Sequence, residues 1–361
     1  MERYSLSVVA ALAAVLAGAG AALALNHPAK GPSPSRGNTR AHSTPSLIPS
    51  FAPHPREWLK ALQKLPRDPK SPRHAKVRHA PKRQPRPVQR LRGTTSIYEH
   101  TTKPWVLAEQ GCSAARRHES GVVVLDFGKP AFKRHGYGTI LFSGHFALNH
   151  QITTGMVGYA RGYVSCLPKR STASITLARG TSNYHPAVPS AYVAGVRWAR
   201  ATNKLGRILR RHGLVAHVEA GAADDAEPAW DPRFHKTKQF FHGFRAAVHG
   251  HSLYDYGSLD GGVGAIWSAR QAWYVAGGIR HTKALPEIYN SAMAREWAEL
   301  ARIAHGLYHR DVRFAGVMTQ GTRSCNCGLR PHAAHRVLAH ALEAHGIGHA
   351  LLPGRGTNII G

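Results

Sequence analysis

The segment GVVVLDFG, residues 121–128, decides the fold of this chain. Its four consecutive apolar side chains, Val122 to Leu125, indicate a strand that is buried on both faces, as in a parallel sheet. The run ends in Asp126 and the turn residue Gly128. Parallel strands are joined by long crossovers that are usually helical. The segment therefore predicts an α/β fold, in which strands alternate with helices.

The sequence after this segment continues the alternation. Helices are expected at residues 150–166, 190–212, 235–248, 291–304 and 331–344. Strands are expected at residues 173–178, 214–219, 253–256, 273–276, 314–318 and 349–352. This alternation predicts a TIM-like (β/α) barrel of about seven to eight strands. A doubly wound open sheet is the competing architecture, although no G-x-G-x-x-G motif follows the first strand to support its nucleotide-binding form.

The first 26 residues are typical of an export signal. An apolar stretch runs from Leu6 to Leu25 behind the basic Arg3, and it ends in the small-residue pattern Ala22 to Ala24 that favours cleavage. A stretch of about 20 apolar residues is also long enough to span a membrane. Residues 1–26 are therefore expected to be either a cleaved signal peptide or a membrane anchor, which places the protein outside the cell or in its envelope.

Residues 27–95 form a second segment with its own composition. They hold 16 Lys and Arg side chains against 2 acidic ones, in a chain whose net charge is +29, and proline recurs every few residues. Such a segment cannot bury enough apolar surface to fold, so we expect a disordered basic linker before a domain at residues 96–361. The linker is expected either to bind anionic envelope polymers or lipid headgroups, or to act as a spacer.

Acidic side chains follow several of the expected strands. Catalytic groups in barrels lie where strands end, and the candidates there are Asp126, Glu219, Asp225, Glu227 and Glu287. Glycoside hydrolysis needs one protonated and one ionised carboxyl group. Glu219 is expected to be the general acid because the apolar run before it would raise its pKa, with Asp126 or Asp225 as the ionised partner. The alternative is that these acids cap loops and helices.

Aromatic side chains near these acids are candidates for holding a sugar. Trp230, Tyr254, Tyr256 and Trp273 are expected to contact the substrate, together with Asp260 in the same region of the chain. Aromatic rings offer broad apolar surfaces with polar edges. The alternative is that those on strands point into the core.

Several ordered motifs carry a resemblance to a known group of proteins. They are residues 218–230, 241–244, 254–258, 285–289 and 314–320. Together they resemble secreted actinobacterial proteins that are similar to glycoside-hydrolase-like barrels, over about residues 112–360. The resemblance implies a TIM-type barrel that acts on or binds carbohydrate. No acid/base pair of an established glycosidase family aligns with it, so a catalytically silent, carbohydrate-binding barrel is the second expectation.

The four cysteines fit an exported protein. We expect the disulfides Cys112–Cys166 and Cys325–Cys327, among three possible connectivities. The alternative is a zinc site, with ligands Cys325, Cys327, His332 and His335. Its spacing does not match a common zinc motif, and no metal or other cofactor is expected.

These observations predict an exported barrel protein that hydrolyses cell-envelope or environmental polysaccharide with paired carboxyl groups. A silent barrel tethered by its basic arm is one alternative. A basic nucleic-acid-binding protein is another, which export from the cell makes less favourable.

Overall fold

The computed structural model describes residues 93–133, 135–320, 328–350 and 356–360. The expected signal or anchor, the linker up to residue 92 and the pair Cys325 and Cys327 lie outside the described residues. No helix in the described part is both long enough and apolar enough to cross a membrane. The first strand starts at Thr94, two residues before the expected start of the domain.

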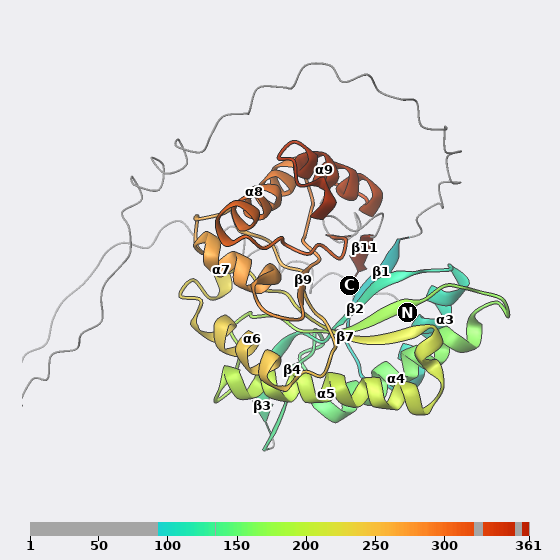
Figure 1. Cartoon of the computed structure of the whole chain (residues 1–361). Helices are drawn as coiled ribbons and strands as arrows, with labels where there is room; N and C mark the ends of the chain where they lie inside the picture. Colours follow the sequence, from blue (N-terminus) through green and yellow to red (C-terminus); the bar gives the residue numbers. More distant parts are fainter. Residues whose placement is uncertain (1–92, 134, 321–327, 351–355, 361) are drawn as a thin grey trace, which may run out of the picture. The chain divides into compact units, whose positions relative to one another are not determined.

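Eight parallel strands form one sheet that is curled as a half-barrel (Figure 1). Their order across the sheet is β10-β11-β1-β2-β6-β7-β8-β9. The strands are β1 (Thr94–Tyr98), β2 (Gly121–Asp126), β6 (Ile175–Gly180), β7 (Val218–Asp224), β8 (Leu253–Asp255), β9 (Thr282–Ala284), β10 (Val317–Gln320) and β11 (Gly356–Ile360). The α/β class and the alternation with helices predicted from the sequence are confirmed.

Helices lie outside this sheet and follow its strands in chain order (Figure 1). They are α3 (Pro104–Arg116), α4 (Asn149–Cys166), α5 (Ala191–Arg211), α6 (His235–Ala247), α7 (Ala269–Trp273), α8 (Ser291–Tyr308) and α9 (Pro331–Glu343). Ser190 caps α5 by accepting a hydrogen bond from the Val193 amide, and Asn290 caps α8 in the same way.

Each strand divides its side chains between two cores. Along β2, Val123 and Leu125 pack outward against helices, whereas Val122 and Val124 point into the concave interior. Tyr254 of β8 belongs to the same interior cluster. Because side chains alternate along a strand, Asp126 continues the interior row at the carboxyl end of β2.

The two ends of the sheet also contact each other through isolated bridges. Ala284 bridges Phe314, and Glu287 bridges Met318, both in parallel orientation. The two bridges are three positions apart on one side, from 284 to 287, and four positions apart on the other, from 314 to 318, so one strand carries an extra residue, as in a β-bulge. Pro286, between the bridges, has no amide hydrogen to donate to a ladder.

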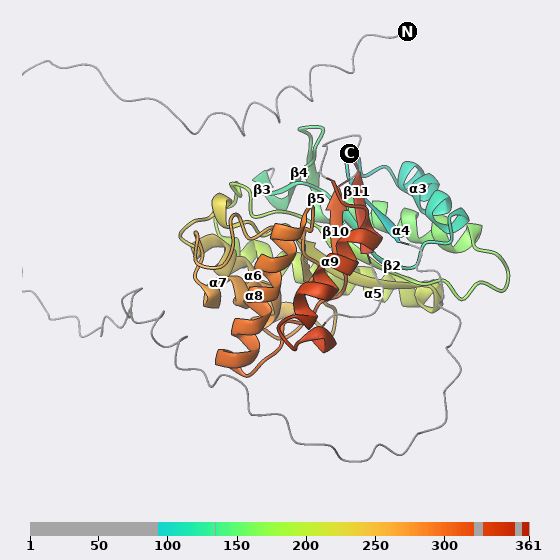
Figure 2. The same ribbon diagram turned by 90° about the horizontal axis from the view of Figure 1, so that it is seen from above.

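A second, antiparallel sheet interrupts the alternation after β2. It consists of β3 (Lys129–Lys133), β4 (Gly136–Ile140) and β5 (Phe146–Leu148), in that order. Figure 2 shows it at the end of the main sheet toward which β10 and β11 run. This sheet was not indicated by the sequence pattern.

Several expected element boundaries were wrong. The strand expected at 214–219 lies instead at 218–224, because Gly213 adopts a left-handed conformation and the next three residues form a 3-10 turn. The strand expected at 273–276 is helical, because Ser268 and Gln271 form a capping box that starts α7. The last strand is Gly356–Ile360, whereas Gly348–Ala350 form a 3-10 turn.

A disulfide joins the ends of two neighbouring helices. Cys112 of α3 and Cys166 of α4 are bonded, with 5.1 Å between their Cα atoms. This pairing confirms the prediction for these two cysteines.

Candidate active site

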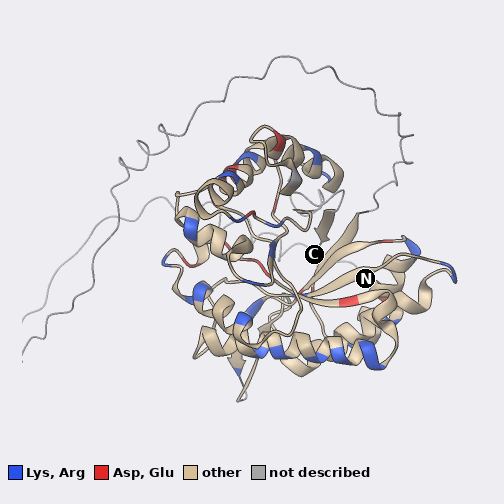
Figure 3. Cartoon of the chain, viewed as in Figure 1, with Lys and Arg blue, Asp and Glu red and all other residues tan. Residues whose placement is uncertain are grey.

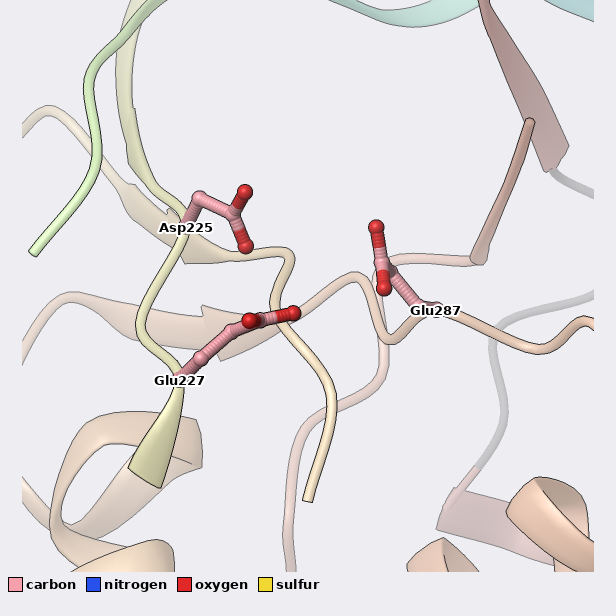
Figure 4. Close-up of side chains that lie close together, drawn as sticks. All are labelled: Asp225, Glu227 and Glu287. Carbon is pink, nitrogen blue, oxygen red and sulfur yellow. The ribbon is translucent and has the colours of Figure 1, made fainter. Parts of the chain in front are cut away.

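Three carboxyl groups meet beyond the carboxyl ends of β7 and β9. One oxygen from each of Asp225, Glu227 and Glu287 lies within 4.8 Å of the others. Figure 4 shows the three side chains directed toward a common space. These residues are called the carboxylate cluster below. Within the described residues, no ion pair joins them to a basic side chain.

Asp225 occupies the interior row of side chains immediately after β7. Its amide donates to the Thr181 carbonyl at 2.8 Å, and its own carbonyl accepts from the Asn183 amide at 3.1 Å. These bonds continue the β6–β7 pairing beyond the named strands, so the backbone of Asp225 is fixed. Its side chain is buried, and the Oδ1 atom has no hydrogen-bond partner among the described residues.

Glu227 is held by the side chain of a neighbouring loop. Asn183 Nδ2 donates to the Glu227 carbonyl at 2.9 Å, and the Glu227 amide donates to Asn183 Oδ1 at 3.1 Å. Asn183 also donates to Thr237 Oγ1 at the start of α6. The Glu227 side chain is partly exposed, whereas those of Asp225 and Glu287 are buried. Glu227 is therefore the most accessible member of the carboxylate cluster.

Glu287 lies on the line of contact between the two ends of the sheet. Its amide donates to the Gly257 carbonyl at 3.3 Å, and its backbone bridges Met318. The Tyr289 hydroxyl donates to Glu287 Oε1. A hydrogen bond to a carboxylate oxygen favours the ionised form.

Burial and mutual repulsion change the acidity of the whole carboxylate cluster. Burial, followed by the charge of Asp260, raises the pKa of Glu227 to about 7. Burial, followed by the charge of Glu227, raises the pKa of Glu287 to about 8. Burial and four neighbouring carboxyl groups raise the pKa of Asp225 well above its usual value. The cluster therefore retains protons near neutral pH, as a general acid requires.

Asp126 and Tyr256 lie next to the carboxylate cluster. Asp126 accepts a hydrogen bond from the Gly128 amide at 2.8 Å, and the neighbouring Tyr256 hydroxyl donates to the Thr181 carbonyl at 3.2 Å. Burial raises the pKa of Asp126 to about 7. Tyr256 is almost fully buried, so its hydroxyl serves as a hydrogen-bond donor, and its ring is not free for sugar stacking.

Trp230 and Asp260 lie near Glu227. Trp230 ends a 3-10 turn that starts one residue after Glu227, and its ring packs edge-on against Tyr184. Asp260 accepts hydrogen bonds from the Ser258 hydroxyl at 2.6 Å and from the Ala229 amide at 2.7 Å. Asp260 thus braces the two loops that hold Glu227.

Three predicted site residues lie away from the carboxylate cluster. Glu219 is the second residue of β7, exposed, and roughly 20 Å from Asp225 at the strand rise of about 3.3 Å per residue. Its placement as general acid is corrected, because the strand starts where it was expected to end. Trp273 lies on α7 and packs on Tyr308 of α8. Tyr254 is buried inside the sheet with its ring 5.8 Å from Lys283 Nζ.

Tyr98 and Tyr289 are site residues that the sequence pattern did not identify. Burial and the charges of the surrounding carboxyl groups, Glu287 foremost, raise the pKa of Tyr98 above its usual range. Tyr98 ends β1, a short Thr-rich strand without a clear apolar run. Tyr289 stands two residues after Glu287, a spacing that could have suggested it.

A small pocket lies on the other side of β7. Asp224, one residue before Asp225, points into it, together with Lys236 and Phe240 of α6. Asp224 Oδ2 is buried without a hydrogen-bond partner in the described part of the chain. The alternation of side chains along the strand thus sends these adjacent acids to opposite faces.

The carboxylate cluster has two chemical capacities. Carboxyl groups at this spacing can share and transfer protons, and three carboxylate oxygens can also ligate a hard divalent cation. Comparison of the sequence with known protein families finds no matching model, and comparison with curated proteins finds no matching protein.

Proposed function

We propose that this protein is an exported glycoside hydrolase with a TIM-like (β/α) barrel. The observation that carries the proposal is the carboxylate cluster, in which Asp225, Glu227 and Glu287 converge at the carboxyl ends of parallel strands. Barrel enzymes place their chemistry at this end, and glycosidases use pairs of carboxyl groups. The resemblance to secreted glycoside-hydrolase-like barrels supports the same reading.

The barrel architecture is supported by the two isolated bridges. Ala284 to Phe314 and Glu287 to Met318 connect the two outermost strands of an eight-stranded parallel sheet. Such contacts are what closure of the sheet requires, because a closed barrel has no free edges.

Glu227 is the proposed general acid, and Glu287 the proposed nucleophile. Glu227 is partly exposed, so a glycosidic oxygen can reach it, and its pKa of about 7 keeps it protonated below neutral pH. Burial and the charge of Glu227 raise the pKa of Glu287 to about 8, so the two carboxyl groups share protons and titrate as a pair. The hydrogen bond from Tyr289 favours the arrangement of this pair in which Glu287 carries the charge and Glu227 the proton. Asp225 holds a proton between them, since its buried Oδ1 has no other partner among the described residues.

The spacing of these groups favours a retaining reaction. Their oxygens lie within 4.8 Å, closer than the roughly 6.5–9.5 Å that leaves room for an attacking water. Glu227 protonates the glycosidic oxygen while its bond to C1 breaks, and Glu287 bonds to C1. A water molecule then gives a proton to Glu227 and its hydroxyl group to C1, which releases Glu287 and restores the protonated acid.

Hydrolysis of a polysaccharide panel tests this proposal. We expect the purified protein to release reducing ends from peptidoglycan, chitin or another glycan, with activity falling as the pH rises above about 7 because Glu227 loses its proton. Glu227→Gln should lower kcat by at least about 100-fold. Glu219→Gln is the matched control and should leave kcat unchanged, because Glu219 is exposed at the other end of β7. Equal activity of Glu227→Gln and the parent protein would refute the assignment.

The burial of two cluster members favours a second candidate function, carbohydrate binding without catalysis. Asp225 and Glu287 are only 7% and 6% exposed, which leaves little room for an attacking group. In this case the panel shows binding but no release of reducing ends. In both cases we propose that residues 27–92 hold the protein to anionic envelope polymers or lipid headgroups.

A further inference from the structure

Two pairs of aromatic side chains lie on loops beside the carboxylate cluster. The first pair is Tyr98 and Phe142, whose ring centroids are 4.6 Å apart. The second is Tyr184 and Trp230, 5.3 Å apart. Neither Tyr98, Phe142 nor Tyr184 stood among the residues that the sequence marked for substrate binding.

Phe142 is an exposed ring that its surroundings hold in place. It is 42% exposed, although large apolar side chains are usually buried. Its amide donates to the Glu99 carbonyl at 3.3 Å, next to Tyr98, and the turn around it is closed by a bond from the Gly144 amide to the Leu141 carbonyl. Leu141 itself is buried. A rigid, exposed ring of this kind can bind a ligand at low cost in conformational entropy.

Tyr98 links this pair to the carboxylate cluster. The charges of Glu287, Asp225 and Glu227 all act on its hydroxyl group. The Tyr98 ring therefore contacts Phe142, while its hydroxyl group lies near enough to the carboxylate cluster for those charges to add to the effect of burial in raising its pKa.

The second pair is attached to Glu227. Tyr184 follows Asn183, which hydrogen-bonds the Glu227 backbone, and Trp230 stands three residues after Glu227. Tyr184 is 37% exposed, and Lys129 Nζ lies 5.3 Å from its ring. This pair thus offers a ring face and a cation in the same place.

We propose that the two aromatic pairs are separate sugar-binding subsites, so that the ligand is a glycan chain and not a single sugar or a disaccharide. The pairs belong to the ends of β1 and of β6 and β7, and β1 lies three strands from β7. At about 4.8 Å per strand, Tyr184 after β6 and Trp230 after β7 lie roughly 10 and 14 Å from β1 along the sheet, which is more than one sugar ring. The proposal rests on the proposed function for its ligand class, but it concerns binding and not hydrolysis.

Binding to the full-length Glu227→Gln protein tests the subsites without turnover. The probes are chitohexaose, cellohexaose and peptidoglycan sacculi, with chitobiose and cellobiose as the short controls. We expect at least one hexasaccharide to bind more tightly than its disaccharide in calorimetry. Adding Phe142→Ala or Tyr184→Ala should weaken hexasaccharide binding about tenfold, the loss of roughly 1.4 kcal/mol, and should affect the disaccharide less.

Tyr192→Ala is the matched control. Tyr192 is 38% exposed, as Tyr184 is, but its ring packs on His242 between α5 and α6, so hexasaccharide affinity should not change. Equal affinity for long and short probes, unchanged affinity in both Ala variants, or binding to no probe would overturn the subsites. Hydrolysis without dependence on chain length would remove the subsites and leave the proposed hydrolase standing. If binding depended on chain length but the parent protein hydrolysed none of the probes, the subsites would stand and the proposed hydrolase would be refuted.

Discussion

The raised pKa of Glu287 makes the stability of the folded protein depend on pH. Burial and the charge of Glu227 raise its pKa from 4.5 to about 8. Between these two values the folded protein binds more protons than the unfolded chain, so this group makes the folded state less stable as the pH rises through the window. We expect Glu287→Gln to increase the free energy of unfolding at pH 8 by on the order of 4 kcal/mol, and to change it little at pH 4.5.

Urea unfolding at the two pH values measures this effect. Glu219→Gln serves as the control, because Glu219 is exposed and should show the same small change at both. The histidines cancel in the comparison, since every variant carries the same set. A Glu287→Gln protein whose stability followed the parent at each pH would show that the burial of this carboxyl group costs nothing.

The carboxylate cluster was largely predictable from the sequence, but its detailed roles were not. Asp225 and Glu227 follow an expected strand, and a parallel sheet brings such ends together, whereas β9, the strand before Glu287, was not expected. Glu219 was misplaced because a left-handed glycine and a 3-10 turn shift the start of β7 by four residues. Tyr98 was missed because its position depends on a pairing of β1 with β2 and β11, which no local pattern reveals.

The helix pair α3 and α4 depends on glycines at its crossing. A Cβ atom on Gly162 would lie 1.9 Å from the Ala108 carbonyl oxygen, and one on Gly158 would lie 2.2 Å from that of Pro104. Because these neighbours are backbone atoms, the helices must separate to admit a side chain. We expect Gly162→Ala to lower the free energy of unfolding by about 3 kcal/mol or more. Gly306→Ala in α8, with no atom near its Cβ, should instead raise it by about 0.5–1 kcal/mol.

Chemical unfolding of the two variants, side by side, provides the measurement. If Gly162→Ala and Gly306→Ala changed stability in the same direction, the close crossing of α3 and α4 would not be what holds them together. A reducing agent separates this effect from that of the disulfide Cys112–Cys166, which joins the same helices.

At the scale of elements, long periodic segments were predicted well and short ones poorly. Helices α5 and α8 agree closely with expectation because each combines an apolar face with a capping side chain. The three-residue strand β9 owes its place to its neighbour β8, so its own sequence says little about it, whereas β8 was expected at residues 253–256 and lies at Leu253–Asp255. The antiparallel sheet β3–β5 was missed for the same reason.

The whole molecule has two sources of positive charge. One is the linker, and the other is the folded domain, where Arg197, Arg200, Lys204 and Arg207 lie exposed on α5, a helix without acidic residues (Figure 3). We expect deletion of residues 27–92 to leave the domain folded, since β1 starts at Thr94, and to reduce retention on anionic cell-envelope fragments at low salt.

Sedimentation with envelope fragments at about 0.05 and 0.5 M salt measures this retention, because added salt screens exposed charges. A charge-reversed α5 variant of the full chain is the comparison. If deletion left retention unchanged while the α5 variant lost it, the linker would be a spacer and the domain would carry the attachment.

The two bridges at Ala284 and Glu287 affect how water reaches the concave interior of the sheet. Four backbone hydrogen bonds hold this line of contact; Pro286 accepts one of them through its carbonyl but has no amide hydrogen to donate another. Transient separation there breaks fewer bonds than separation of the continuous ladders between β2, β6 and β7. Glu287 lies on this line. Each such opening would expose Glu287 and Asp225 to water and let them exchange protons with it, while the rest of the sheet stays intact.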